Sequence, residues 1–228
     1  MKSLSVFFPA HNEVDNIAKL VEDTDRALRD RVEDYEIVVV NDGSNDGTRE
    51  LLDQTVERFP NLCPVHHEQN TGYGGAVKTG FAESKKELVF FSDGDGQFDI
   101  SEIGMFLDDI DDYDGILGYR INRQDPAHRK AFAKCWGLLI RILFGIKVRD
   151  LDCAFKMFHR EKLDGITLDA EGAMITVELM AKLKRKGFRF KEIGVHHYPR
   201  TAGEQSGGSP KVVLKAFREL FKLYGRLR

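Results

Sequence analysis

Apolar and polar residues form alternating blocks along the first hundred residues, and this pattern predicts strands and helices in turn. Short apolar runs rich in β-branched and aromatic residues are typical of buried strands. The predicted strands are residues 4–8, 35–40, 62–67 and 87–91. The predicted helices between them, with apolar residues at helical spacing, are residues 13–30, 49–59 and 74–86. The alternation indicates an α/β fold with a mostly parallel central sheet flanked by helices.

The second half of the chain continues this pattern less regularly. Residues 114–120 and 189–200 have strand-like composition, and residues 128–146, 173–186 and the segment from about Pro210 have helical spacing. The length of 228 residues fits one large domain. No apolar stretch reaches the ~18–20 residues of a membrane span, and we expect no signal peptide.

Three polar clusters directly follow predicted strands. They are "PAHNE" at 9–13, "NDGSNDGT" at 41–48 and "SDGDGQFD" at 92–99. In parallel sheets of this kind, ligands bind beyond the carboxyl ends of the strands. We therefore expect the three clusters to lie side by side on one edge of the sheet.

The third cluster concentrates acidic residues in a way that suggests a metal. Asp93 and Asp95 are two positions apart, so in extended chain their side chains project the same way. Gln97 adds a neutral oxygen, and oxygen ligands suit Mg²⁺ or Mn²⁺. A surface turn rich in Asp and Gly is the alternative explanation.

The other motifs each admit two interpretations. Asp42 closes a predicted buried strand and could bind a base or ribose, or it could fix a local turn. His11 and Glu13 are equally ambiguous, since an acid suits the first turn of a helix. The glycines of 71–80 either admit a phosphate to a helix N-terminus or allow close packing of helix and sheet.

Charge is distributed unevenly along a chain whose net charge is −3. Residues 120–150 carry eight Lys or Arg against two acids, and the residues after Ser209 carry six against Glu219. A basic C-terminal half suggests an anionic partner such as a phosphate or a lipid surface. The three cysteines form no C-x-x-C pair, which argues against a zinc site.

Two basic helical segments also carry apolar side chains. Those of the first are Trp136, Leu139, Ile140 and Leu143. Those of the C-terminal segment are Val213, Phe217, Leu220 and Tyr224. Both segments fit helices that lie in a membrane interface, and both fit core helices with solvated basic flanks.

The motifs in this order resemble the inverting glycosyltransferases of family 2. The N-terminal stretches that carry the resemblance are "FFPAHNEVDNI", "VVVNDGSNDGT", "NTGYGGAVKTG" and "FFSDGDGQFD". The downstream stretches "GYR", "RDLDCAFKMF" and "HHYPRTAGEQSGG" are similar to the dolichol-phosphate mannose synthase branch. The resemblance covers essentially the whole chain. It implies a GT-A fold, a nucleotide-sugar donor and a divalent metal, Mg²⁺ or Mn²⁺.

The family's functional residues can be carried over to matching positions. The resemblance places Pro9, His11, Glu13, Asp42, Lys78 and Asp93 at the nucleotide sugar. It places Asp93, Asp95 and Gln97 at the metal. It places Arg120, Arg129 and Arg200 at the acceptor phosphate, with Asp95, Arg120 and Arg200 as the catalytic group. The chain departs from the family pattern at Asn41, where many relatives have Asp, and at 203–206, where "GEQS" replaces G-E-S-K.

The resemblance also divides the single domain. Residues 1–118 are the expected nucleotide-sugar-binding half, residues 119–208 the acceptor-binding half, and residues 209–228 a basic amphipathic helix. We expect a cytoplasmic protein, peripheral at the membrane surface, that binds no nucleic acid; its oligomeric state stays open.

The acceptor remains a choice between a polyprenyl phosphate and a sugar hydroxyl. A phosphate monoester ionises a second time near pH ~6, so it needs no general base, whereas a hydroxyl needs a carboxylate. The basic segment favours the phosphate, while Asp150, Asp152 and Glu178 keep the hydroxyl possible. A soluble saccharide-modifying enzyme, a nucleotidyltransferase and a non-catalytic nucleotide-binding module are the rival functions.

Overall fold

A computed structural model describes residues 2–121, 127–200 and 210–227, with side chains omitted at 127–134 and 210–215. The strands are β1 (Ser3–Ala10), β2 (Asp34–Asp42), β3 (Leu62–His67), β4 (Leu88–Phe91), β5 (Gly115–Ile121), β6 (Lys156–His159) and β7 (Phe190–His196). The α-helices are α1 (Ile17–Leu28), α2 (Thr48–Thr55), α3 (Tyr73–Glu83), α4 (Ile103–Asp109), α5 (Ala127–Phe144), α6 (Arg160–Leu163), α7 (Met174–Arg185) and α8 (Pro210–Leu227). Two 3₁₀ turns, η1 (Ile100–Glu102) and η2 (Ile110–Asp112), flank α4.

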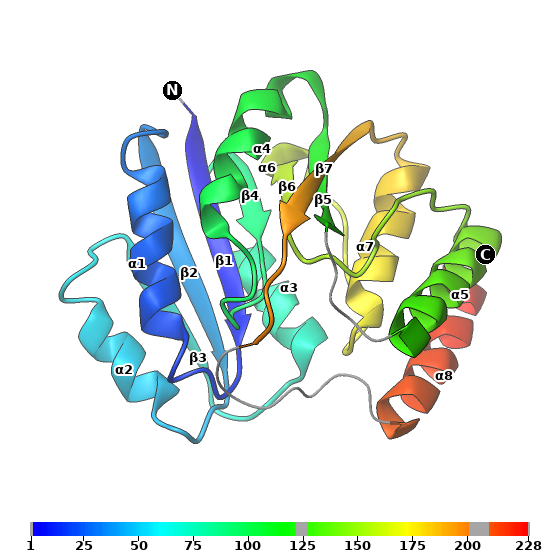
Figure 1. Ribbon diagram of the computed structural model, residues 1–228, viewed down its shortest axis with the longest axis horizontal. Coiled ribbons are helices and arrows are strands. Elements are labelled where there is room, and N and C mark those ends of the chain that lie inside the picture. Colours follow the sequence, from blue (N-terminus) through cyan, green and yellow to red (C-terminus); the bar gives the residue numbers. More distant parts are fainter. Residues whose placement is uncertain (1, 122–126, 201–209, 228) are drawn as a thin grey trace.

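The strands form one sheet in the order β3-β2-β1-β4-β6-β5-β7 (Figure 1). Six of them run parallel, and only β6 is antiparallel to its neighbours β4 and β5. The carboxyl ends of the six therefore share an edge with the start of β6. The predicted, mostly parallel α/β architecture is confirmed.

The register brings the three polar clusters together as expected. Ala10 at the end of β1 pairs with Asn41 of β2, and Phe7 pairs with Phe91, the last residue of β4. The three strands are adjacent, so the chain leaves each of them at the same edge. Helices α1 and α3 cover opposite faces of this part of the sheet (Figure 1).

Aromatic packing under this edge fixes the strands that carry the site. Phe7 stacks on Phe91 with ring centroids 5.4 Å apart, and Phe81 of α3 meets both rings edge-on. Such aromatic pairs contribute about 0.5–1.5 kcal/mol each beyond their buried area. The strand ends thus emerge from an aromatic layer in which Phe7 and Phe91 are buried and Phe81 is partly buried.

Helices α5 and α8 lie side by side beyond α7, at the right of Figure 1. Trp136 of α5 meets Phe217 of α8 edge-on at 5.2 Å, and Phe144 meets Tyr224 at 5.7 Å. For Trp136, Phe217 and Tyr224 the sequence left a membrane-facing and a core position open, and all three pack between the two helices. For them, the core interpretation applies.

The exposed apolar residues of these helices are different ones. Leu138 and Ile142 of α5 are 58% and 70% exposed, and Phe221 of α8 is 60% exposed. Trp136 and Ile140, for which the sequence left a membrane-facing and a core position open, are buried. Among the described helices, none is long and apolar enough to cross a bilayer.

Candidate active site

The acidic pair lies where the sequence predicted, just beyond β4. Asp93 accepts a hydrogen bond from the Tyr73 hydroxyl at 3.0 Å, which ties it to the start of α3. The residue between the two aspartates is Gly94. A side chain does not fit there, because a Cβ would lie 2.7 Å from the carbonyl oxygen of Pro9. The loop therefore passes in van der Waals contact with the end of β1, which brings both aspartates close to the β1–α1 segment.

Burial and mutual repulsion disfavour a full negative charge on both members of the pair. Burial and the neighbouring Asp95 raise the pKa of Asp93 to about 6, although Tyr73, Lys156 and Arg120 act in the opposite direction. Burial and the nearby Asp93 also raise the pKa of Tyr73 well above its usual value, so the phenol stays a hydrogen-bond donor. Two buried carboxylates that repel each other suit a divalent cation, which would remove the repulsion between them.

The donor set fits Mg²⁺ or Mn²⁺ shared with a substrate better than a metal held by protein alone. Among the described residues, no three His, Cys, Asp or Glu side chains form a metal-binding group. Mg²⁺ commonly takes one or two carboxylates and completes its shell with water and substrate phosphates. Asp93 and Asp95 match that arrangement.

Gln97 has a structural task that the sequence did not suggest. Its side-chain Nε2 donates to the carbonyl of Tyr198 at 2.7 Å, and the Tyr198 amide donates back to the Gln97 carbonyl at 2.7 Å. An isolated bridge between Phe98 and His197 continues this pairing. The acidic loop is thereby fastened to the segment after β7, and a metal-binding role for Gln97 stays a prediction.

This pairing brings Arg200 close to Asp93 and Asp95, at the part of the sheet's edge that we call the acidic edge. Its Nη2 donates to Oε1 of Glu13 at 2.5 Å, and its Nη1 lies 3.8 Å from Oδ2 of Asp95. Burial raises the pKa of Glu13, and hydrogen bonds from Asn16 and Arg200 offset this only in part. Two residues separated by 187 positions, both predicted for the site, thus meet beside Asp95.

Arg120 reaches the same edge from the end of β5, held by Asp150. Its Nε and Nη2 donate to the two oxygens of Asp150 at 2.7 and 2.8 Å, and its amide donates at 3.2 Å. Burial lowers the pKa of Arg120, but the Asp150 carboxylate outweighs this and raises it above the usual value. Arg120 in turn lowers the pKa of Asp93, so the two arginines border different members of the acidic pair.

Lys156, at the start of the antiparallel β6, is a candidate site residue that the sequence did not reveal. It is 1% exposed and donates to the carbonyls of Leu151 and Cys153. Burial lowers its pKa, while the surrounding Cys153 and acids act to raise it. It stands close enough to Asp93 to lower the pKa of that carboxyl. It was not predicted because its neighbours in the sequence, "CAFKMF", are mostly apolar and give no sign of a site.

Asp42 fixes the local course of the chain, which is one of the two interpretations considered for it. Its Oδ1 accepts hydrogen bonds from the amide and hydroxyl of Thr71 at 2.8 and 2.7 Å and from His67 Nδ1 at 2.7 Å. Burial raises its pKa, but these bonds outweigh it, so the pKa lies below the usual value. His11 Nδ1 donates to the Asp42 carbonyl at 2.8 Å, which places both residues at the end of β2. Contact with a nucleoside stays a prediction for Asp42, His11 and Pro9.

The glycine-rich start of α3 supports the packing interpretation. A Cβ at Gly74 would lie 2.6 Å from the carbonyl of Ala170, and the Gly74 amide already donates to Glu171 at 2.8 Å. Lys78, farther along the helix, lines a separate hollow of about 400 Å³ together with Arg160 and other residues of 160–168. The structure therefore does not bring Lys78 into the acidic group.

Of three further sequence assignments, only Glu178 can be located. Glu178 accepts hydrogen bonds from the amides of Asp169 and Ala170 and pairs with Lys182 at 2.6 Å, so it serves the fold of that segment. The side chain of Arg129 and the whole of 203–206 lie outside the described residues.

Comparison with known proteins agrees with this geometry. The sequence model of Glycosyl transferase family 2 matches residues 5–167. A dolichyl-phosphate β-glucosyltransferase of Trichomonas vaginalis is 30% identical, over 84% of this chain and 64% of the relative. An undecaprenyl-phosphate 4-deoxy-4-formamido-L-arabinose transferase of Pseudomonas fluorescens is 27% identical, over 94% of this chain and 62% of the relative. The chain thus spans less than two thirds of these relatives.

Solved structures share the fold at low sequence identity. Glucosyl-3-phosphoglycerate synthase from Mycobacterium tuberculosis, in complex with Mg²⁺ and uridine diphosphate, superposes with a TM-score of 0.75 over 98% of this chain and 80% of its own. Its sequence is 15% identical. The same enzyme with Mn²⁺ and UDP-glucose gives the same TM-score. The expected GT-A fold is confirmed, and the match of the family model over 5–167 shows that the chain belongs to glycosyl transferase family 2.

Proposed function

We propose that the protein is an inverting, metal-dependent glycosyltransferase that moves a hexose from a nucleotide sugar of the GDP-mannose or UDP-glucose type to the phosphate of a polyprenyl or dolichyl phosphate. The observation that carries the proposal is the acidic edge. Asp93 and Asp95 follow β4 beside the ends of β1 and β2, with Arg200 3.8 Å from Asp95 and Arg120 acting on Asp93. Family 2 membership supports the reaction class.

The donor half of the reaction follows from the acidic pair. Asp93 and Asp95 would hold Mg²⁺ or Mn²⁺, which supplies positive charge to the departing diphosphate. Tyr73 keeps Asp93 in place through its hydroxyl, and Asp42 with His11 borders the expected nucleoside position. Arg200, which Glu13 orients, adds a fixed cation at the same edge. Such preorganised charges stabilise a transition state without reorganising as the reaction proceeds.

The acceptor half favours a phosphate over a hydroxyl. A hydroxyl acceptor needs a carboxylate base. Of the three candidate bases, Asp150, Asp152 and Glu178, two are bound to other groups. Asp150 binds Arg120 through both oxygens, and Glu178 binds backbone amides. A phosphate dianion attacks without a base, but arginines must offset its repulsion by the donor diphosphate. The names of the relatives, which specify dolichyl and undecaprenyl phosphates, support the same choice.

A membrane surface is the proposed location of the acceptor. Leu138, Ile142 and Phe221 are exposed apolar side chains on adjacent helices, α5 and α8, that also carry exposed cations. Apolar residues flanked by Lys and Arg suit an anionic bilayer, where each cation contributes about 1 kcal/mol. Binding to anionic vesicles that weakens as salt rises, with little binding to neutral vesicles, is the expected result.

A transfer assay tests the proposal directly. Purified protein is incubated with GDP-mannose, UDP-glucose and other nucleotide sugars, with Mn²⁺ or Mg²⁺, and with a short polyprenyl phosphate, the corresponding free alcohol or simple sugars. We expect a glycolipid product only with the phosphate. Transfer to a sugar hydroxyl and none to the lipid phosphate would contradict the acceptor, and release of pyrophosphate from a nucleoside triphosphate and a sugar phosphate would indicate a nucleotidyltransferase.

A further inference from the structure

His66 and His67 end β3, and each ring is bonded to one of the two residues that end β2. In the parallel pairing of the two strands, His66 lies opposite Asn41 and His67 lies opposite Asp42. Successive residues of a strand point to opposite faces of the sheet, so the two rings diverge. His66 bonds a side chain of α2 at 3.1 Å, and His67 bonds Thr79 of α3 at 2.9 Å. Two adjacent histidines thus hold two adjacent strand ends, one on each face.

The carboxylate of Asp42 is held through only one of its two oxygens. Oδ1 receives all three hydrogen bonds that described residues donate to this carboxylate, two from Thr71 and one, at 2.7 Å, from Nδ1 of His67. Oδ2 has no partner among these residues, although the side chain is only 4% exposed. No buried side-chain oxygen or nitrogen in the described part of the chain lacks a partner, so solvent reaches Oδ2. A ligand at the end of β2 would therefore meet a single, nearly buried acceptor.

The ring of His67 is itself fixed by bonds to both of its nitrogens. An ionised carboxylate only accepts hydrogen bonds, so Nδ1 donates to Asp42. Nε2 of the neutral ring then accepts from the Thr79 hydroxyl at 2.9 Å. The bond at one nitrogen decides which nitrogen carries the proton, and here both bonds favour the same tautomer. Thr79 thereby holds His67 as the donor that orients Asp42.

We propose that His67 is a positioning residue that directs Oδ2 of Asp42 toward the base of the donor nucleotide and thereby selects bases with a ring N–H. The inference rests on the proposed function, because it assumes that a nucleotide sugar binds at the end of β2. Uracil and guanine carry a ring N–H that a carboxylate oxygen accepts. Cytosine and adenine have a ring nitrogen with a lone pair at the corresponding position. A site built around one acceptor rejects these two, because its own oxygen stays unpaired when they bind.

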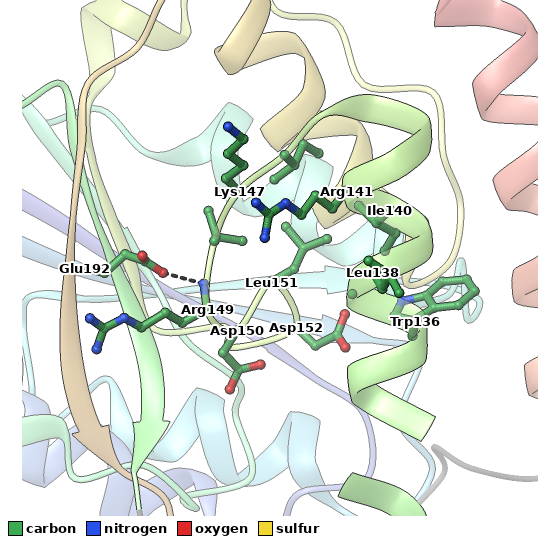
Figure 2. A pocket seen from close by; sticks show the side chains of 13 residues that line it. Trp136, Leu138, Ile140, Arg141, Lys147, Arg149, Asp150, Leu151, Asp152 and Glu192 are labelled. Carbon is green, nitrogen blue, oxygen red and sulfur yellow. Dashed lines mark hydrogen bonds between the residues drawn. The ribbon is translucent and has the colours of Figure 1, made fainter. Parts of the chain in front are cut away.

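The residues of the acceptor side are held by another part of the chain. Three strands separate β2 from β5, where Arg120 lies. Asp150, which binds Arg120, lines a hollow of about 690 Å³ between α5 and the segment that leads into β6 (Figure 2). In sugar transfer we therefore expect a His67 variant to raise the KM for the nucleotide sugar and to leave the KM for the acceptor unchanged.

Calorimetry with UDP, CDP, GDP and ADP, each with Mn²⁺, tests the selectivity. We expect the parent protein to bind UDP at least about tenfold more tightly than CDP, or GDP than ADP, because the wrong base leaves Oδ2 unpaired. His67→Phe keeps a ring but has no donor, and it should bind the favoured nucleotide about tenfold more weakly and CDP and ADP as before. Equal affinities of the parent for all four nucleotides would overturn the inference. An equal loss for all four in His67→Phe would also overturn it, because a purely structural role has that effect.

Three further variants locate the effect at the Nδ1 donor. His67→Asn keeps an N–H near the position of Nδ1 and should restore most of the affinity that His67→Phe loses. Thr79→Val removes the partner of Nε2 and should reduce the selectivity about threefold. His66→Phe is the matched control, since its side chain is 13% exposed against 16% for His67 but is bonded to Asn41, and it should bind all four nucleotides as the parent does.

Circular dichroism and the urea midpoint show whether each variant folds. Equal effects of His66→Phe and His67→Phe, or no recovery in a folded His67→Asn, would contradict the positioning role. If His67→Phe does not fold, Thr79→Val provides the test, and an unchanged selectivity in that variant would contradict the proposal.

The transfer assay separates this inference from the proposed function. Normal sugar transfer to a polyprenyl phosphate, with a base selectivity that does not depend on His67, would reject the role of His67 and leave the glycosyltransferase intact. A selectivity that depends on His67, in a protein that transfers no sugar, would support the nucleotide contact and reject the proposed reaction.

Discussion

Asp150 should be a positioning residue for Arg120, and replacing it tests how the acceptor side is built. The Asp150→Ala variant removes both oxygens that receive Nε and Nη2 of Arg120, at 2.7 and 2.8 Å, and the acceptor of its amide at 3.2 Å. Asp150 and Arg120 are only 11% and 16% exposed at their side chains, so water would replace the lost bonds poorly. The guanidinium would remain as a largely buried charge without this partner.

The magnitude follows from those contacts. A hydrogen bond to a charged group contributes about 1.5–3 kcal/mol, and removing one member of a buried ion pair costs about 3–5 kcal/mol. Because both side chains keep some access to water, we expect the lower end, about 3 kcal/mol of the free energy of unfolding. Asp150→Asn keeps one acceptor and should lose roughly half of this. A 228-residue protein loses about 2–4 °C of Tm per kcal/mol.

Urea unfolding at 25 °C measures the effect. The midpoint should fall while the slope stays constant, because the surface exposed on unfolding is unchanged. The control is Asp108→Ala, at an exposed position of α4, which should stay within about 0.5 kcal/mol of the parent. Sugar transfer by Asp150→Ala should fall by up to about 10²-fold, because Arg120 loses its orientation. A stability change below about 1 kcal/mol with normal transfer would refute the positioning role.

Three further perturbations probe the acidic edge and the loop beside it. Gly94→Ala should cost about 1–3 kcal/mol and weaken Mn²⁺ binding, because its Cβ meets the Pro9 carbonyl; Gly225→Ala, with open space around it, is the control, and equal effects would contradict the close approach. Asp42→Asn should be less stable than the parent near neutral pH. That difference should shrink below pH ~4, because the pKa of Asp42 is lowered on folding and its contribution is lost as pH falls through that pKa; a difference independent of pH would refute this. Lys156→Met should raise the pH midpoint of Mn²⁺ binding, since Lys156 lowers the pKa of Asp93, and an unchanged midpoint would argue against it.

Periodicity and strand-end chemistry were enough to place most of the framework. Strands buried on both faces read as continuous apolar runs, and β3 was predicted at residues 62–67, where it lies. The strand β6 escaped prediction because it has four residues, and its antiparallel direction depends on pairing between distant segments. Lys156 went unrecognised with it, since a lysine inside an apolar run carries no local signal of burial beside two aspartates.

The positions of individual side chains were also hard to predict where they depend on contacts between distant parts of the chain. The order of the motifs predicted Asp93, Asp95 and Glu13 for one edge, but Arg200 is held there by a hydrogen bond to Glu13, which lies 187 positions away in the chain. In α5 the segment "WGLLIRILF" is apolar around most of its circumference, so spacing alone did not reveal that Leu138, rather than Trp136, faces outward. Tertiary packing decides which side of such a helix is buried.

The central claim is that Asp93 and Asp95 carry a divalent metal that is required for sugar transfer to a polyprenyl phosphate. The most direct measurement is transfer to a short polyprenyl phosphate by the parent protein and by Asp95→Asn, each with Mn²⁺ and with excess EDTA. We expect the parent to lose activity in EDTA and regain it with Mn²⁺. Asp95→Asn should fold normally yet transfer about 10²–10³-fold more slowly at any metal concentration. Full activity in EDTA, or a near-parental rate for Asp95→Asn, would contradict the account.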